Sequence, residues 1–314
     1  MLLQIQKYRV LIGCIGWLVW MLAVQPHPLD VAWGRGILLL APLVIVPMAT
    51  DVLTRTAPFF ASQILHKILR WQLPSAALFA VAFLLPNGWF ATVCVLPWVS
   101  VTFAIAAVGF GEIWRGAWRD GASFSLAAGM AYLSVAGIWA VMERLGFYPF
   151  GFNPEIVFLT IVHFHYAGFL LPVLAGLASR RLGAGVFTKI TCYFTVVGVG
   201  LLAVGITLTQ LGLDTNWEMA SAWLMALSAA AVAAMHLRLA FLKDNALKIR
   251  LLWAMSAIAL LGGMLLAGLY GSRFLAQIPW LDIPVMRALH GSLNAIGFGL
   301  CAVWGWWVES RKTV

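Results

Sequence analysis

The sequence predicts an all-α fold: a polytopic transmembrane bundle of about ten helical spans, with both termini on the cytoplasmic side. Three observations carry this prediction, namely the composition, the lengths of the apolar stretches and the distribution of Lys and Arg. Of the 314 residues, 63% are hydrophobic and 10% are charged, and the mean hydropathy is +0.94. A water-soluble domain carries roughly 25% charged residues, so the solvent for this chain is lipid. We therefore expect residues 1–314 to form a single transmembrane domain.

The apolar stretches define the predicted spans. A helix needs about 20 predominantly apolar residues to cross the hydrocarbon core of a bilayer. Suitable stretches cover residues 9–25, 36–54, 74–87, 89–111, 121–143, 155–178, 186–213, 217–240, 250–271 and 284–308. The weakest is 74–87, and the sequence Pro86-Asn87-Gly88 at its end is typical of a tight turn. Residues 74–111 are thus predicted to form two short or tilted helices.

An amphipathic segment precedes the third span. Residues 58–71 carry apolar side chains at helical spacing, with two basic side chains off that stripe. The stripe consists of Phe60, Ile64, Ile68 and Trp71, and the basic residues are Lys67 and Arg70. A helix of this kind lies in the interface between lipid headgroups and acyl chains. We expect residues 58–71 to lie at the cytoplasmic surface of the membrane.

The distribution of basic residues orients the bundle. With ten spans, the termini and the even-numbered connections share one side, and 16 of the 20 Lys and Arg residues fall there. The other four are Arg35, Arg144, Arg273 and Arg287. An excess of Lys and Arg marks the cytoplasmic side, so both termini are predicted to be cytoplasmic. The same bias explains the net charge of +9 without nucleic acid as a partner.

Two motifs place histidines inside predicted spans, where polar groups are costly to insert. They read His163-Phe164-His165-Tyr166-Ala167-Gly168-Phe169 in the sixth span and His290-Gly291-Ser292-Leu293-Asn294-Ala295-Ile296-Gly297-Phe298 in the tenth. These spans start on the outer side at Glu155 and Pro284, so His163 lies eight residues deep and His290 six. At about 1.5 Å per residue, the histidines share a level in the outer half of the membrane. We expect a polar pocket there that opens outwards.

Helical geometry divides the sixth span. His163 and Tyr166 lie about 60° apart on one face, whereas His165 points roughly 200° away from His163. A regular helix therefore cannot bring both imidazoles to one ion. Pro172 removes a helical hydrogen bond, and the resulting kink would change this geometry.

The candidate site combines both spans. In the tenth, Arg287, His290 and Asn294 form one stripe at spacings of three and four. The predicted catalytic residues are His163, His165, Tyr166, His290, Asn294 and Glu143. The predicted substrate-binding residues are Arg287, Arg144, Arg35 and Gln210. Simpler roles stay open, because membrane histidines also make hydrogen bonds between helices and Glu143 and Arg144 lie at a solvated span end.

Both histidine motifs resemble the YndJ-like family of bacterial integral membrane proteins. A further similar segment is Leu38-Leu39-Leu40-Ala41-Pro42-Leu43-Val44-Ile45-Val46-Pro47. The likeness covers most of the chain and implies a multi-pass protein of the bacterial cytoplasmic (inner) membrane. It supports the choice of His163, His165, Tyr166, His290 and Asn294 but implies no reaction.

Two classes of function fit such a site best. The sequence favours an intramembrane enzyme that uses acid–base chemistry on a lipophilic, isoprenoid-like or lipid-like substrate, because histidine transfers protons near neutral pH. In this reading Glu143 would donate a proton. The alternative is a secondary transporter of a small metabolite, with the polar pocket as its substrate or proton site. Residues 1–150 and 151–314 show no internal similarity, which speaks against transport.

No cofactor is predicted, and the expected partners are the lipid bilayer and a lipophilic or small-molecule ligand. A divalent-metal variant would use His163 or His165 with His290 and a carboxylate, although the spacing is not a recognised zinc signature. A heme- or quinone-binding protein would need paired ligands such as His163 and His290. The sequence leaves open the choice between enzyme and transporter, the substrate and the oligomeric state.

Overall fold

The computed structural model describes residues 2–56 and 62–311. Within them the chain forms α-helices, π-helical segments and short 3₁₀ turns, and no β-strand. The uninterrupted α-helices are α1 (Leu2–Val24), α4 (Ser62–Ala82), α5 (Trp89–Trp114), α6 (Gly121–Leu145), α9 (Val186–Gln210), α10 (Asn216–Ala240) and α11 (Leu247–Gly271). The 3₁₀ turns are η2 (Ala117–Arg119) and η3 (Pro149–Gly151).

The remaining helices are α-helices interrupted by π-helical turns. They run through α2 (Val31–Leu40), η1 (Ala41–Ile45) and α3 (Val46–Thr56); through α7 (Pro154–His163), η4 (Phe164–Leu170) and α8 (Leu171–Leu182); and through α12 (Ile283–Val285), η5 (Met286–His290), η6 (Leu293–Leu300) and α13 (Cys301–Ser310). π-Helical turns are rare in proteins, and those that occur are often found at functional sites. Here they fall on both histidine motifs and on the proline-containing residues 38–47.

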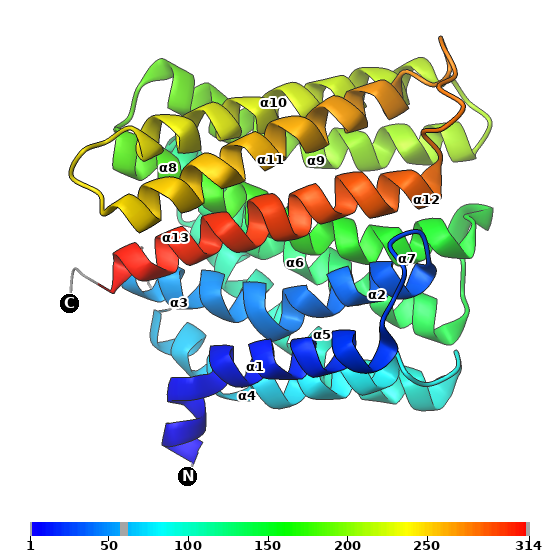
Figure 1. Cartoon of the computed structure of the whole chain (residues 1–314), viewed down its shortest axis with the longest axis horizontal. Coiled ribbons are helices and arrows are strands. Elements are labelled where there is room, and N and C mark those ends of the chain that lie inside the picture. The colour runs from blue at the N-terminus through cyan, green and yellow to red at the C-terminus, as the bar shows by residue number, and fades with distance from the viewer. Residues whose placement is uncertain (1, 57–61, 312–314) are drawn as a thin grey trace.

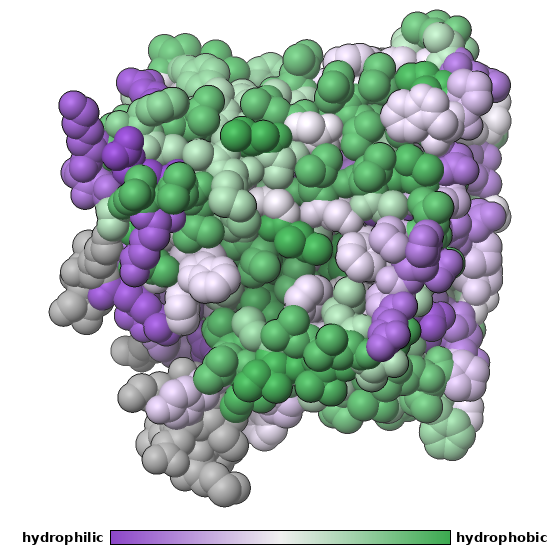
Figure 2. All heavy atoms as spheres, in the orientation of Figure 1, coloured by the Kyte–Doolittle hydropathy of each residue, from purple (hydrophilic) through white to green (hydrophobic). Residues whose placement is uncertain are grey.

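Helix length and composition confirm a polytopic membrane protein. Among the described residues, seven helices are long and apolar enough to cross a membrane, and Tyr8–Val24 is a shorter apolar helix. The helices run side by side, and both ends of the chain lie at the same end of the bundle (Figure 1). Hydrophilic residues gather at the two ends, with a mainly hydrophobic band between them (Figure 2). The count of ten spans and the cytoplasmic placement of the termini stay predictions.

The segment before the third predicted span does not form a helix of its own. Residues 62–71 are the first half of α4, which continues past Pro74 to Ala82 without a break. Residues 58–61 of the predicted interfacial helix lie outside the described part of the chain. The apolar stripe therefore belongs to a longer helix, because proline does not end α4 at this point.

The turn between α4 and α5 is held by the end of α6. Residues 83–88 separate the two helices, so the predicted break is confirmed. Gly88 adopts a φ of +149°, which glycine tolerates and larger residues oppose. The side-chain amide of Asn87 donates to the carbonyl of Glu143 (2.8 Å), and the N–H of Gly88 donates to the carbonyl of Arg144 (2.7 Å). The backbone polar groups of this turn thus find partners on α6.

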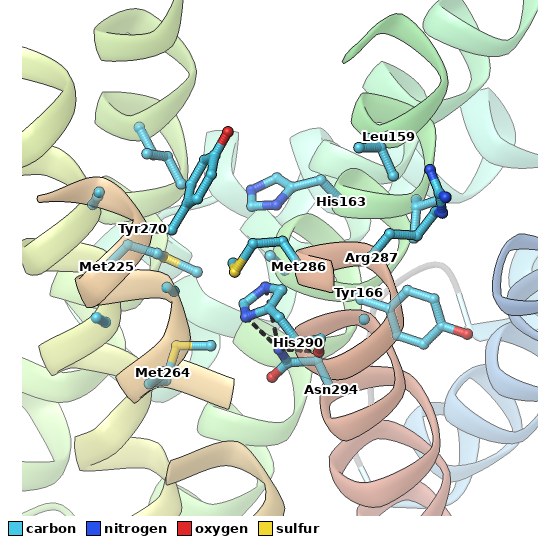
Figure 3. A pocket seen from close by; sticks show the side chains of 18 of the residues that line it. Leu159, His163, Tyr166, Met225, Met264, Tyr270, Met286, Arg287, His290 and Asn294 are labelled. Atoms are coloured by element: carbon cyan, nitrogen blue, oxygen red, sulfur yellow. Dashed lines mark hydrogen bonds between the residues drawn. The ribbon is translucent and has the colours of Figure 1, made fainter. Parts of the chain in front are cut away.

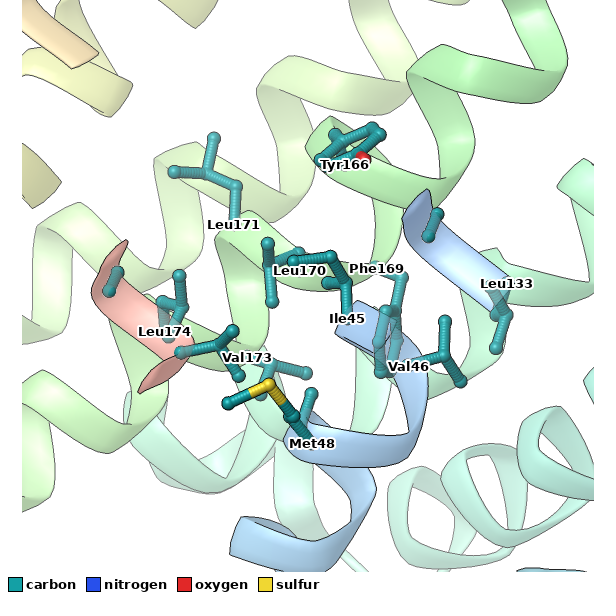
Figure 4. Packing of buried hydrophobic residues seen from close by; sticks show 14 of the residues in the cluster. Ile45, Val46, Met48, Leu133, Tyr166, Phe169, Leu170, Leu171, Val173 and Leu174 are labelled. Carbon is teal, nitrogen blue, oxygen red and sulfur yellow. The ribbon is translucent and has the colours of Figure 1, made fainter. Parts of the chain in front are cut away.

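The span Val31–Thr56 forms the centre of the bundle. Its most apolar stretch is 94% buried, whereas that of Val186–Gln210 is 39% buried and leaves more surface for lipid. Figure 4 shows Ile45, Val46 and Met48 packed against residues of η4 and α8. A helix that is apolar on all sides suits this position because neighbouring helices cover it completely.

Proline in the central span frees a carbonyl for a side chain. Pro42 has no N–H to bond the carbonyl of Leu38, and the N–H of Ala41 bonds it instead. The carbonyl of Ile37 consequently lacks its usual helical donor. The hydroxyl of Tyr166 donates to it at 2.9 Å. This bond ties the central span to the helix that carries the first histidine motif.

Candidate functional site

A cavity of about 290 Å³ lies among α2, α7–η4, α9, α10, α11 and the last helix. Its lining residues fall within 156–171, 218–226, 260–273 and 283–298, together with Gly34, Ile37, Leu202 and Ile206. These stretches belong to the half of the bundle away from the chain termini (Figure 1). The cavity therefore lies in one half of the bundle, and the assignment of that half to the outer side of the membrane stays a prediction.

His290 is held by the neighbouring helix α11. Its Nδ1 lies 2.8 Å from the carbonyl oxygen of Gly263. A carbonyl only accepts hydrogen bonds, so in the neutral ring this contact favours the tautomer with the proton on Nδ1 and a lone pair on Nε2. Asn294 donates from Nδ2 to the backbone carbonyl of His290 (2.8 Å), and Nδ2 lies 3.2 Å from both ring nitrogens. A Cβ on Gly263 would lie 2.7 Å from Nδ2 of Asn294, so this packing requires glycine.

His163 faces the same cavity from a different helix. It is the last residue of α7, directly before the π-helical turn η4. Figure 3 shows the rings of His163 and His290 directed into one space, with Met286 beside them. Among the hydrogen bonds of residues 2–56 and 62–311, none involves the ring of His163. Both ring nitrogens are therefore available to a ligand.

Two ion pairs lie at the end of the cavity away from the chain termini. Glu218 at the start of α10 accepts a hydrogen bond from Arg273 after α11, with 2.6 Å between Oε1 and Nη2. Arg287 pairs with Glu155 in the first turn of α7 and also donates to the carbonyl of Leu29. These contacts join the loops and helix ends at this end of the cavity.

The rest of the cavity wall is apolar. Methionine side chains from three helices line it, namely Met225, Met264 and Met286. Leu171 and Phe298 are buried at the level nearest the centre of the bundle. Methionine is flexible and polarisable, and it adapts to apolar ligands of different shapes. The cavity thus offers a few polar groups on a largely apolar surface, which is the usual composition of a small-molecule site.

Residues 36–298 match a family model described as YndJ-like protein. The chain belongs to the YndJ-like family. It is 30% identical over 289 residues to the "Uncharacterized membrane protein YndJ" of Bacillus subtilis (strain 168), an alignment that covers 90% of this chain and 50% of that protein. The chain thus spans about half the length of this curated relative. No solved structure matches it.

Both histidine motifs and both ion pairs fall within the residues that match the YndJ-like family. His165 nevertheless lies outside the cavity and is completely buried. Its Nδ1 lies 2.8 Å from the carbonyl of Ile161, and its Nε2 accepts a hydrogen bond from Nε1 of Trp98 (3.2 Å). The kink considered at Pro172 does not bring His165 back to His163. The predicted group of three histidines is therefore a group of two.

His236 on α10 repeats the arrangement of His165. Its Nδ1 lies 3.1 Å from the carbonyl of Val232, and Nε1 of Trp306 donates to its Nε2 at 3.3 Å. The ring is completely buried. Sequence reasoning did not single out this residue, although a lone histidine inside an apolar span was a visible signal. Both nitrogens are used within the protein, so His236 connects α10 to the last helix.

Tyr166 contributes its ring to the cavity but not its hydroxyl. Figure 3 shows the hydroxyl pointing away from the space between the histidines. It donates to the carbonyl of Ile37, as described above. The predicted catalytic use of Tyr166 would require this hydrogen bond to break.

Glu143 and Arg144 are not brought to the histidines. They pair with each other at the end of α6, and neither lines the cavity within the described part of the chain. Arg144 also donates to the carbonyls of Ala82 (3.2 Å) and Leu85 (3.3 Å), and its guanidinium lies 4.4 Å from the ring centroid of Phe83. This ion pair therefore has a structural role, because Arg144 satisfies carbonyl groups at the end of α4.

Two further predicted residues lie away from the cavity, whereas Arg287 lines it. Arg35 is half-buried on α2 and is not part of the described lining. Gln210 is exposed at the end of α9, where Nε2 donates to the carbonyl of Gly151 (3.1 Å). Of the predicted substrate-binding residues, Arg287 therefore shares the cavity with the histidines.

Three residues that shape the site were not among the predicted catalytic or substrate-binding residues. Glu218 and Arg273 were visible as charges at span ends, but nothing along the chain indicated that they pair. Gly263 was visible only as part of the Gly262-Gly263 pair in an apolar stretch. No three His, Cys, Asp or Glu side chains of the described residues converge in a way that could hold a metal ion.

Proposed function

We propose that the chain is an intramembrane enzyme that transfers protons to and from a lipophilic substrate bound between His163 and His290. The observation that carries this proposal is that two imidazoles from different helices line one largely apolar cavity inside the membrane. Ionisable side chains in a transmembrane segment are costly and mark functional sites by default. A lipophilic molecule reaches such a cavity at a low desolvation cost.

His290 is proposed as the group that removes a proton from the substrate. Its hydrogen bond to Gly263 favours the tautomer in which Nε2 is unprotonated, and an unprotonated imidazole nitrogen is an efficient base near neutral pH. Asn294 is proposed to position the ring, because its side chain bonds the backbone of His290 one turn earlier. Gly263 and Asn294 act on the reaction only through the orientation of this imidazole.

His163 is proposed as the group that returns a proton. Its ring has no hydrogen bond within the described residues, so a substrate atom is free to bind it. A proton taken from one atom by His290 and a proton given to another by His163 leave the substrate with the same composition. The two rings then restore their protonation states by passing one proton back. Isomerisation is the simplest reaction that such a pair performs.

The proposal is tested by lipid conversion in nanodiscs. Purified protein would be incubated in D₂O with neutral lipids extracted from the cells that express it, and the lipids analysed by mass spectrometry. We expect at least one lipid species to change retention time or to incorporate deuterium with the wild-type protein. His163→Leu and His290→Leu should abolish the change, and His165→Phe should retain it because His165 lies outside the cavity.

Two results would reject the proposal. One is the absence of any lipid change that depends on both His163 and His290. The other is equal loss of activity in His165→Phe while that variant stays folded by circular dichroism, since this would place the chemistry elsewhere in the membrane domain.

A further inference from the structure

Each charged residue on the cavity wall has a partner of opposite charge. The charged residues of the described lining are Glu218, Arg273 and Arg287. Glu218 pairs with Arg273 at 2.6 Å, and Arg287 pairs with Glu155. Each cation that faces the cavity thus has a carboxylate partner on the protein. An anionic ligand would have to displace such a carboxylate to gain a counter-ion.

The wall offers no partner to a cationic ligand either. Within the described lining, Glu218 is the carboxylate, and Arg273 already occupies it. The deeper polar groups are the imidazoles of His163 and His290 and the amide of Asn294, which hydrogen-bond neutral groups well. Apart from the phenol of Tyr270, the remaining wall is apolar, and transfer of an unpaired charge from water to such surroundings is strongly unfavourable.

We infer that the ligand of this cavity is an uncharged amphiphile: an apolar chain or ring system with one hydroxyl or carbonyl group. The polar group meets His163, His290 and Asn294, and the apolar body lies against the methionines. This inference rests on the ligand-binding cavity of the proposed function and not on its proton transfer. The ion pair of Glu218 and Arg273 is the element that sets the charge preference.

The inference is tested with three probes that share one chain: decan-1-ol, decane-1-sulfonate and decyltrimethylammonium. Sulfonate and quaternary ammonium keep their charges at every working pH. Displacement of radiolabelled decan-1-ol would be measured in nanodiscs and corrected for partition into protein-free discs. For the wild-type protein we expect both charged probes to displace the label at least about tenfold more weakly than decan-1-ol.

Two substitutions should switch the preference in opposite directions. Glu218→Gln leaves Arg273 without its carboxylate, and we expect decane-1-sulfonate to gain about tenfold in affinity. Arg273→Met leaves Glu218 unpaired, and decyltrimethylammonium should gain instead. If one of the two variants fails to fold, the other still tests the inference by itself.

The matched control is an ion pair away from the cavity. Arg181 pairs with Asp244 in the loop between α10 and α11, and its hydrogen bond lowers the pKa of Asp244, so this pair is charged at the working pH. Asp244→Asn removes one carboxylate as Glu218→Gln does, although Arg181 keeps a second carboxylate partner in Glu309. We expect it to leave the order of the three probes unchanged.

The outcomes separate this inference from the proposed function. Equal binding of charged and uncharged probes to the wild-type protein, or a shift of both cavity variants in the same direction, would overturn the inference even if lipid conversion still required His163 and His290. A reciprocal switch without any lipid conversion would support the inference and reject the proposed chemistry.

Discussion

The two pairs of histidines inside the helices of this membrane domain differ in what surrounds their nitrogens. His165 and His236 each bond a carbonyl one turn earlier through Nδ1 and accept from a tryptophan through Nε2. His163 and His290 line a cavity, and at least one nitrogen of each is free of backbone contacts. The comparison shows that a histidine inside a membrane is not in itself a functional group. We expect a histidine whose two nitrogens both bond within the protein to stabilise the fold, and a histidine whose ring lines the cavity to meet a ligand.

The same difference extends to the charged residues. Glu143 and Arg144 are buried beside the end of α4, where they pair with each other and Arg144 donates to the carbonyl of Ala82. Glu218 and Arg273 face the cavity. Substitutions in the first region should therefore reduce stability and spare ligand binding, and substitutions in the second should do the reverse. The following variants test that division in order of their expected effect on the free energy of unfolding.

The largest loss of stability is expected for Arg144→Met. It leaves Glu143 as an unpaired charge in a buried position and removes the donors for the end of α4, at a cost of about 3–5 kcal/mol. Reversible unfolding in mixed micelles with increasing dodecyl sulfate measures this change. The control is Arg115→Met, whose guanidinium is half exposed beside Glu112. Equal stability of the two variants would show that the buried pair does not hold this region.

A smaller loss is expected for His165→Phe. It strands the buried N–H of Trp98, which costs about 1–3 kcal/mol. Removal of both partners is closer to neutral, so His165→Phe combined with Trp98→Phe should regain part of the lost stability. The same unfolding assay on the single and double variants measures the coupling. Additive losses would argue against a structural hydrogen bond between these two side chains.

Tyr166→Phe should cost about 1 kcal/mol, the net value of one buried hydrogen bond. Tyr166 lines the cavity with its ring but gives its hydroxyl to Ile37, so we expect lipid conversion to survive this substitution. Measurement of both lipid turnover and the free energy of unfolding in the same preparation shows whether Tyr166 belongs with the residues that stabilise the fold or with those that act in the cavity. Complete loss of turnover at unchanged stability would return Tyr166 to the list of catalytic groups.

The smallest effect on stability is expected for His163→Leu. Its ring has no hydrogen bond within the described residues, and leucine suits the apolar wall, so the free energy of unfolding should change by less than about 0.5 kcal/mol. Lipid conversion should nevertheless disappear. A loss of stability as large as that of His165→Phe would instead place His163 among the structural histidines.

Local sequence patterns predicted much of the fold. Apolar stretch length predicted the helical membrane bundle, and Pro86-Asn87-Gly88 predicted the break between α4 and α5. Helical spacing also predicted that His165 points away from His163. Each of these features depends on residues that are close together along the chain.

The partners that decide function are distant along the chain, which is why the sequence alone did not reveal them. Trp98 bonds His165 across 67 positions, and Arg287 pairs with Glu155 across 132. Without its contact to Trp98, His165 could not be told apart from a cavity residue. The π-helical turns add to the difficulty because they change the angular step between side chains.

The most direct test of the division between histidines is their reaction with diethyl pyrocarbonate, which modifies unprotonated imidazole nitrogens that a reagent can reach. Folded protein in nanodiscs would be treated briefly, digested and analysed by mass spectrometry, with exposed His27 as the reactive standard. We expect His163 and His290 to be modified, and His165 and His236 to react only after unfolding. Decan-1-ol should protect the first pair. Equal reactivity of all four residues in the folded protein, or modification of His165 and His236 before His163 and His290, would contradict the account.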